Sequence, residues 1–473
     1  MAACLWWWCS GGRLDRGVGH NFLASDVDQG FLLPPDMREW LDPDHLAFFV
    51  MDAVAQFDMS GFNAGYRCDG RGGAAYEPRL LVGLLLFAYC DGVKSSRQIE
   101  RRCVRDVAYR VLVGNRLPDH ATIARFRDRH RAALQQLFVQ VLRLCAEAGL
   151  VRVGLVALDG TKLRADASPL KNYDQARVDK AIASLDQQIG EMLAAAEQVD
   201  AVEDAAVRDG DDPGPPVELK DRQRRLAKLK EAKGRLDAQV AEAQRVQDQR
   251  RADFQAGSGL RGAPPAEKPP KEALTGLRTN LTDPDSRVMH VSGGFAQAYN
   301  GQAVVTADQV IIEAEVVPAA VDFDAFHPLL DQARANLDEA GVADPIRAVT
   351  ADAGYSSAKN RHHERGGGNN PIQLVSVPGL GGKRSADQEG RPDPRLANDP
   401  ALGRMAKRLA NPAGRRLYAR RKVMVEPVFG QLKQRSGPRL QHRGMDKVNT
   451  EWKMMAAAHN LLKCWRRHTL QMA

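Results

Sequence analysis

Hydrophobic residues in positions 31–150 recur with the three- and four-residue spacing of amphipathic helices. Pro78 begins a predicted buried helix, PRLLVGLLLFAYC. Ser96 is the predicted N-cap of a second helix, which Gly114 ends. A third, longer helix is predicted from Asp119 until Gly149. The pattern therefore predicts an all-helical N-terminal domain.

Residues 172–276 have the pattern of an inserted helical hairpin. Ile182, Leu185 and Ile189 share one helical face, and Leu226, Leu229 and Leu236 follow the same spacing after the turn-rich GDDPGPP. The last part of the segment is rich in proline and glycine, which predicts a flexible linker. We interpret the hairpin as a spacer or a self-association arm, because heptad-like patterns carry no catalytic information.

Strand-like runs appear on both sides of this insertion. LVAL precedes it, and QAVVT, QVIIEAEVV, IRAV and IQLVSVP follow it, with one amphipathic helix that Gly341 ends. Residues 151–171 and 277–473 are therefore predicted to form one α/β domain that the insertion interrupts. MAACLWWWCSGG lacks the charged start and long apolar region of a signal peptide. Residues 1–30 are predicted to be a non-native or disordered N-terminal extension instead.

Composition narrows the class of protein. The net charge of +8 and the pI of about 9.1 favour a polyanionic partner. The seven cysteines include no C-x-x-C pair, which indicates reduced thiols rather than disulfides or a zinc site. The longest apolar run, residues 80–89, is about half the length that a helix needs to cross a bilayer. These features predict a cytoplasmic protein without a membrane partner.

Arginine is dense between Lys94 and Arg131, where Arg125, Arg127 and Arg129 alternate along one predicted helix. One interpretation is a solvated helix face. The other is a DNA-binding surface, which requires many basic side chains on one face to contact phosphates. The helix–turn–helix appearance of the segment favours DNA.

The segment LVALDGTKLR ends an apolar run at Asp159. An aspartyl-phosphate mechanism would need a second Asp at position 157, which is Ala157. Two roles remain for Asp159: it binds a metal ion, or it caps a turn. Asp352 follows IRAVTA in the same way, and neighbouring strands would bring the two carboxylates together. Because close carboxylates repel each other, such a pair usually persists with a cation. Glu426 is the predicted third ligand, on a helix face shared with Lys422 and Lys433.

At this point the chain resembles the bacterial insertion-sequence DDE transposases of the IS-four-like superfamily, which carry a Tyr-Arg-Glu-Lys signature. The resemblance rests on LDGTKLRADAS, TADAGYSS and YARRKVMVEPVFGQLK, in that order. The superfamily spaces its signature as Tyr-x2-Arg-x3-Glu-x6-Lys. Here one extra residue separates Arg421 from Glu426, whereas Lys422 keeps the x3 spacing, so either side chain is a candidate for the arginine's role.

The resemblance implies an RNase H-like core with a mixed five-stranded sheet, whose catalytic and metal-binding residues are Asp159, Asp352 and Glu426. It implies two Mg²⁺ ions roughly 4 Å apart, which Mn²⁺ would replace. Tyr418, Arg421 or Lys422, and Lys433 would hold DNA phosphates. The implied partners are the terminal inverted repeats and a target DNA, bound by a homodimer. The rival functions are an inactive DNA-binding derivative and an RNase H-like nuclease that cuts without joining.

Two local expectations follow from the residues. His362 and His363 are weak candidates for metal ligands, and His459 is predicted to be a packed, hydrogen-bonded residue. Pro427 directly follows Glu426, so the helix must either begin at Pro427 or continue through it with a kink. We favour the continuous, kinked helix.

Overall fold

A computed structural model describes residues 36–66, 75–204, 217–255, 265–269, 276–317, 323–357, 360–361, 371–376 and 399–472. The predicted extension 1–30, the histidines 362 and 363 and most of the predicted linker lie outside these residues.

The N-terminal part is all-helical, as predicted. Its elements are η1 (Met37–Trp40), α1 (Leu46–Ala55), α2 (Ser60–Asn63), α3 (Pro78–Cys90), α4 (Ser96–Arg105), α5 (Val107–Leu112), α6 (His120–Arg129) and α7 (Arg131–Glu147). Pro78 is the first residue of α3, as predicted, whereas Ser95 rather than Ser96 is the N-cap of α4.

Two predicted helices are each broken in two. The helix after Ser96 ends at Arg105, because Asp106 adopts extended geometry and its carboxylate caps α5 through the amide of Ala108. The long helix predicted from Asp119 breaks at His130, whose backbone has φ −110° and ψ 28°. The buried His130 ring packs against Phe126 and Tyr66, so tertiary contacts override the local helical pattern there.

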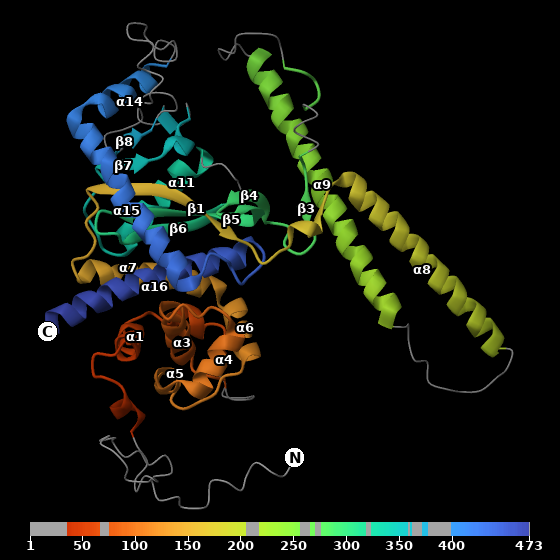
Figure 1. The fold of residues 1–473 in the computed structure, drawn as a ribbon, viewed down its shortest axis with the longest axis horizontal. Coiled ribbons are helices and arrows are strands. Elements are labelled where there is room, and N and C mark those ends of the chain that lie inside the picture. Colours follow the sequence, from red (N-terminus) through yellow and green to blue (C-terminus); the bar gives the residue numbers. More distant parts are fainter. Residues whose placement is uncertain are drawn as a thin grey trace, which may run out of the picture.

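A mixed sheet forms the centre of the α/β part (Figure 1). Its strands are β1 (Leu155–Arg164), β4 (Arg287–Val291), β5 (Gly294–Thr306), β6 (Ile311–Val317), β7 (Ala348–Ala351) and β8 (Ile372–Val375). The order is β4-β5-β1-β7-β8, and β6 also pairs with β5. β1 is antiparallel to β5 and parallel to β7, which is parallel to β8. This mixed α/β arrangement is consistent with an RNase H-like DDE domain.

The sheet has six strands rather than the five expected. The additional strand, β4, forms a hairpin with an N-terminal extension of β5. Gly293 and Gly294 make the turn with positive φ angles of 91° and 119°, which side chains rarely adopt. β4 has only five residues, which is too short for a clear periodic signal, and the sequence pattern therefore missed this hairpin.

Alternate residues of β1 face two separate hydrophobic cores. Leu155 and Ala157 pack in the core that contains Val425 and Phe429 of α15 (Pro412–Ser436) and much of α16 (Met445–Met472). Val156 and Leu158 pack in the other core. That second core contains the buried face of α11 (Phe326–Glu339) and part of α14 (Pro400–Ala410). Because side chains alternate along a strand, Asp159 lies on the α15 side of the sheet.

The inserted segment contains the two predicted helices, α8 (Gln175–Asp204) and α9 (Val217–Gln255). They form an arm that projects from the body of the molecule (Figure 1). The short pair β2 (Asn172–Tyr173) and β3 (Thr279–Asn280) closes its base. Leu185, Leu229 and Leu236 form its small core, and Lys233 pairs with Asp179 across the two helices at 2.6 Å.

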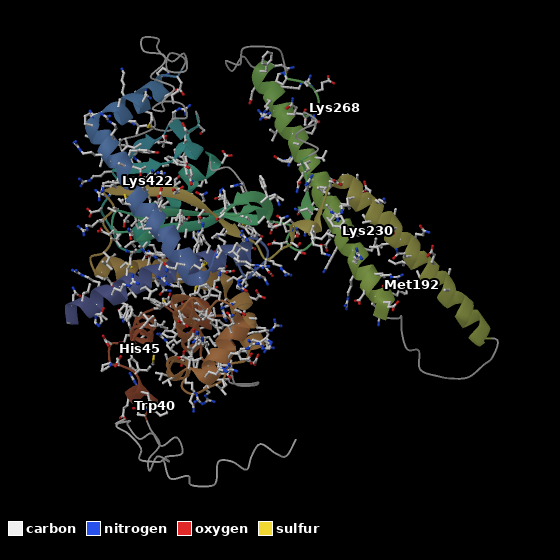
Figure 2. The ribbon with its side chains drawn as sticks, viewed as in Figure 1. Trp40, His45, Met192, Lys230, Lys268 and Lys422 are labelled. Carbon is white, nitrogen blue, oxygen red and sulfur yellow. The ribbon has the colours of Figure 1, made fainter. Side chains whose placement is uncertain are left out.

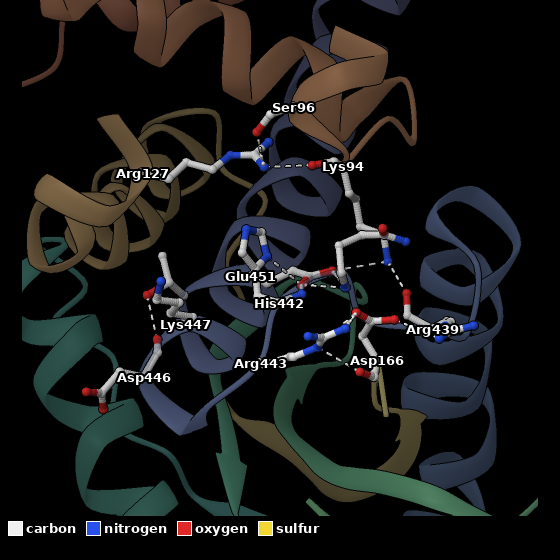
Figure 3. A network of polar contacts seen from close by, with 12 residues as sticks. Lys94, Ser96, Arg127, Asp166, Arg439, His442, Arg443, Asp446, Lys447 and Glu451 are labelled. Atoms are coloured by element: carbon white, nitrogen blue, oxygen red, sulfur yellow. Dashed lines mark hydrogen bonds and ion pairs between the residues drawn. The ribbon is translucent and has the colours of Figure 1, made fainter. Parts of the chain in front are cut away.

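A network of buried polar contacts joins the N-terminal helices to α16 (Figure 3). Lys94 forms an ion pair with Glu451 at 3.2 Å and donates a hydrogen bond to the carbonyl of Arg439 at 2.6 Å. Glu451 also accepts hydrogen bonds from the amides of Gln441 and His442. Burial raises the pKa of Glu451, but the His442 hydrogen bond and the nearby charges outweigh this and keep the pKa below its ordinary value.

His459 of α16 is packed and hydrogen-bonded, as predicted. Its side chain is buried, and Nε2 lies 3.0 Å from the carbonyl of Gln309. Burial lowers the pKa of His459 to about 4, so the ring is neutral near pH 7. No helix in the part of the chain that the structure describes is long and apolar enough to cross a membrane.

We predict that Glu451→Gln lowers the free energy of unfolding by about 3–5 kcal/mol, because it leaves the Lys94 ammonium buried without its counter-charge. The two side chains are only 0% and 3% exposed. Urea unfolding followed by circular dichroism measures the effect. Asp331→Asn is the control: it breaks the exposed Asp331–Arg334 pair, which should contribute less than about 1 kcal/mol. Equal losses in the two variants would contradict the prediction.

Candidate functional site

The sheet brings Asp159 and Asp352 to adjacent positions. β1 and β7 run in parallel with Leu158 opposite Ala351, so the next residue on each strand is one of the two aspartates. Asp352 directly follows the last residue of β7, as predicted. Its carboxylate caps η4 (Ala353–Tyr355) by accepting a hydrogen bond from the amide of Gly354 at 2.8 Å.

Asp159 does not end its strand, contrary to the prediction. β1 continues to Arg164, and Asp159 pairs with Ala303 of β5. Gly160 continues the strand next to Asp159. A Cβ at Gly160 would collide with the side-chain amide of Gln302 and lie 2.9 Å from Asn300 Oδ1. The glycine is therefore required by these buried polar side chains of β5.

Glu426 lies on α15, which continues through Pro427. The structure thus confirms the prediction of helix on both sides of Pro427. Met424, Val425 and Val428 are buried around this position, and their packing offsets the hydrogen bond that proline cannot donate. The Glu426 side chain is 55% exposed, and its Oε1 lies 3.9 Å from Nη2 of Arg421.

Arg421 contacts Asp159 directly. Its Nη1 donates to Oδ2 of Asp159 at 2.5 Å, and the two side chains are 13% and 15% exposed. The guanidinium therefore bridges a strand carboxylate and the helix carboxylate of Glu426. Sequence reasoning missed this contact, because residue spacing alone does not show which side of α15 faces the sheet.

The three carboxylates do not form a metal centre in this conformation. Their hard oxygen donors suit Mg²⁺. However, Oδ1 of Asp159 accepts from the amide of Gly160 at 2.8 Å, and Oδ2 accepts from Arg421. Within the described residues, no group of three or more His, Cys, Asp or Glu side chains is placed to hold a metal ion. The guanidinium of Arg421 places a positive charge in direct contact with Oδ2 of Asp159.

The remaining residues of the predicted phosphate-binding set also lie on α15. Lys422 is exposed, and Tyr418 and Lys433 are half-buried (Figure 2 labels Lys422). Burial lowers the pKa of Lys433 from its ordinary value. The most accessible cation of this set is therefore Lys422.

The three arginines predicted to contact DNA from α6 differ in placement. Arg125 is exposed, with a side-chain hydrogen bond to Thr122 at 3.2 Å. Arg129 is exposed too, and its guanidinium stacks on the Tyr66 ring and donates to the carbonyl of Gly65. Arg127 is buried, donates to the carbonyl of Lys94 at 2.7 Å and lies over the Tyr89 ring. Its placement corrects the prediction, because a buried guanidinium is not presented to a phosphate.

A second group of arginines lines a surface hollow on α4. Its basic members are Arg101, Arg102 and Arg105, and all three side chains are exposed. They belong to the arginine-dense segment that the sequence identified, and the structure places them on one helix face. Such a hollow suits a polyanion.

Two segments of the chain match known families. Residues 35–129 match a transposase domain (DUF772), and residues 394–465 match a transposase DDE domain. No curated protein and no solved structure matches the chain. The first segment covers α1 to α6. The second covers α15 with Arg421, Glu426 and Lys433, whereas Asp159 and Asp352 lie outside both. The two matches support a DDE transposase.

We predict that Arg127→Ala lowers the free energy of unfolding by about 1–3 kcal/mol, because it leaves the carbonyl of Lys94 buried without its donor. Arg125→Ala should change stability by less than about 0.5 kcal/mol, since its side chain is exposed. Chemical unfolding of both variants measures the difference. If Arg127→Ala were as stable as Arg125→Ala, the structural role assigned to Arg127 would be wrong.

Proposed function

We propose that this protein is an insertion-sequence transposase that binds the ends of its element and catalyses DNA strand cleavage and strand transfer. The observation that supports the proposal is the adjacent placement of Asp159 on β1 and of Asp352 directly after the parallel strand β7. The third residue of the proposed set, Glu426, lies on the segment that matches a transposase DDE domain. A bridging contact from Arg421 links Glu426 to Asp159.

The roles of the three carboxylates follow from their chemistry. Phosphodiester cleavage by DDE transposases depends on divalent cations, and we propose Mg²⁺ here, with Mn²⁺ as a substitute. The carboxylates supply hard oxygen donors from both the sheet and α15. Removing the charge of one of them should impair catalysis without altering the basic surfaces that contact DNA.

The basic surfaces of the N-terminal helices and of α15 are joined at one place. Gly92, in the turn after α3, approaches the backbone carbonyl of Arg435 so closely that a Cβ there would collide with it. Lys94 donates to the carbonyl of Arg439, just beyond α15. The exposed Arg439 and Arg443 follow, both paired with Asp166 after β1. We infer a continuous DNA track from α4 and α6 to α15.

The proposed substrate is double-stranded DNA, namely the terminal inverted repeats and a target, bound by a homodimer. A nuclease that cuts without joining remains the second candidate, and a strand-transfer assay separates the two. Joined products from a pre-cut terminal end and a plasmid target support transposition. Cleavage of the end without any joined product would support the nuclease.

We predict that Asp159→Asn, Asp352→Asn and Glu426→Gln each reduce Mg²⁺-dependent cleavage of a terminal-repeat duplex by at least about 100-fold, or about 2.7 kcal/mol in the barrier. DNA binding by Asp352→Asn and Glu426→Gln should stay within about threefold of wild type, because both variants keep the basic residues and the Asp159–Arg421 pair. Gel assays of cleavage and fluorescence anisotropy measure the two effects. A variant with near-normal cleavage would remove that residue from the site.

We predict that Arg125→Ala with Arg129→Ala weakens DNA binding and lowers its salt dependence by about one unit of log–log slope for each lost phosphate contact. The two arginines are exposed on α6. Anisotropy titrations at increasing salt measure the slope. Arg334→Ala, which removes an arginine from α11 in the α/β part, is the matched control. An unchanged slope in the double variant would place α6 outside the DNA interface.

A further inference from the structure

Both carboxylate oxygens of Asp159 accept hydrogen bonds from the protein. Oδ1 accepts from the amide of Gly160, and Oδ2 accepts from the guanidinium of Arg421. Each oxygen keeps a second lone pair, but a metal ion bound at Oδ2 would lie next to the positive guanidinium of Arg421. The backbone contact of Oδ1 is local to β1, whereas the contact of Oδ2 comes from a long side chain on another element. The Arg421 contact can therefore be exchanged without a change in the backbone of β1.

Electrostatics explain why the arginine at position 421 contacts Asp159. Asp159 and Asp352 occupy adjacent backbone positions, Arg421 contacts both Asp159 and Glu426, and nearby like charges destabilise one another. The guanidinium contributes one positive charge and reaches two of the three carboxylates, at 2.5 Å and 3.9 Å. It compensates their repulsion when no other cation is bound. A divalent cation in the same place would repel the guanidinium, so the two occupants exclude each other.

Arg421 has an alternative partner once DNA is present. It lies on the same helix as the exposed Lys422, on the proposed phosphate-binding face. Guanidinium groups bind phosphate through paired, charge-assisted hydrogen bonds. Nε of Arg421 is buried and has no hydrogen-bond partner among the residues that the structure describes, so one of its donors is unsatisfied there. A DNA phosphate would compete with Asp159 for this side chain.

We propose that Arg421 couples DNA binding to metal loading in this protein. In the DNA-free protein it closes Asp159 to divalent cations, and on DNA binding it moves to a phosphate and opens the carboxylate. This inference rests on the proposed function. Because binding free energies are reciprocal, bound metal must strengthen DNA binding by the same factor by which DNA strengthens metal binding.

The first test measures Mn²⁺ affinity of the full chain without DNA, by the electron paramagnetic resonance signal of free Mn²⁺. Arg421→Gln should bind Mn²⁺ about tenfold more tightly than wild type, within the usual range of coupling between sites. Arg420→Gln is the matched control, because it removes one exposed arginine from the same helix. It should leave Mn²⁺ affinity within about twofold of wild type.

The second test measures anisotropy of a labelled terminal-repeat duplex with and without saturating Mn²⁺, at matched ionic strength. Mn²⁺ should tighten DNA binding by wild type and by Arg420→Gln by about the same tenfold factor. Arg421→Gln should show little tightening. If Arg421→Gln does not fold, Arg421→Lys replaces it; its single charge lacks the paired donors and should give intermediate Mn²⁺ affinity.

Equal Mn²⁺ affinities of wild type and Arg421→Gln in the DNA-free state would overturn the coupling, and so would equal tightening of DNA binding by Mn²⁺ in both. Failure of the proposed function gives a different result. In that case wild type would not bind the duplex at all, while the DNA-free titration would still decide whether Arg421 excludes the metal.

Discussion

The parallel pairing of β1 with β7 is the constraint on which the candidate site depends. Its register places Leu158 opposite Ala351, and this single alignment makes Asp159 and Asp352 neighbours. A shift of β1 by one residue would turn Asp159 to the other face, into the core that contains Val156 and Leu158. The register is fixed because both faces of β1 are buried against different cores. Packing of the apolar residues therefore positions the charged ones.

A second constraint joins the N-terminal helices to this core. The Lys94–Glu451 pair and the contact of Lys94 with the Arg439 carbonyl are buried and share one ammonium group. A movement of Lys94 would therefore break both contacts, which fixes the N-terminal helices relative to α16. Gly92 allows the backbones of the two parts to touch. The helices α4 and α6 are therefore held at a fixed position relative to α15. Such rigidity favours a protein that must place a defined phosphate at a catalytic residue.

The sequence predicts the parts of this molecule that repeat a periodic pattern. The strand before Asp352, the helix at Pro78 and the two long helices of the insertion are all present. Prediction from the sequence is wrong where tertiary contacts determine the local structure. The helix break at His130 depends on aromatic packing, and the burial of Arg127 depends on the carbonyl of Lys94. The extension of β1 beyond Asp159 depends on pairing with β5. Local spacing contains none of this information.

The extra residue between Arg421 and Glu426, relative to the Tyr-x2-Arg-x3-Glu-x6-Lys spacing, changes which side chain shares a helix face with Glu426. Residues four apart on a helix differ by about 40° around the axis, and residues five apart by about 140°. Lys422, four residues before Glu426, therefore shares the face of Glu426 and is exposed. Arg421 lies to the side, where it meets Asp159 of the sheet and only its second nitrogen approaches Glu426. The outward-facing charge and the contact with the strand carboxylate, which one arginine would combine, thus belong to two residues, Lys422 and Arg421. Lys422 presents its charge to solvent whether or not the Arg421–Asp159 contact is made, whereas Arg421 must first leave the strand carboxylate before it can reach a phosphate.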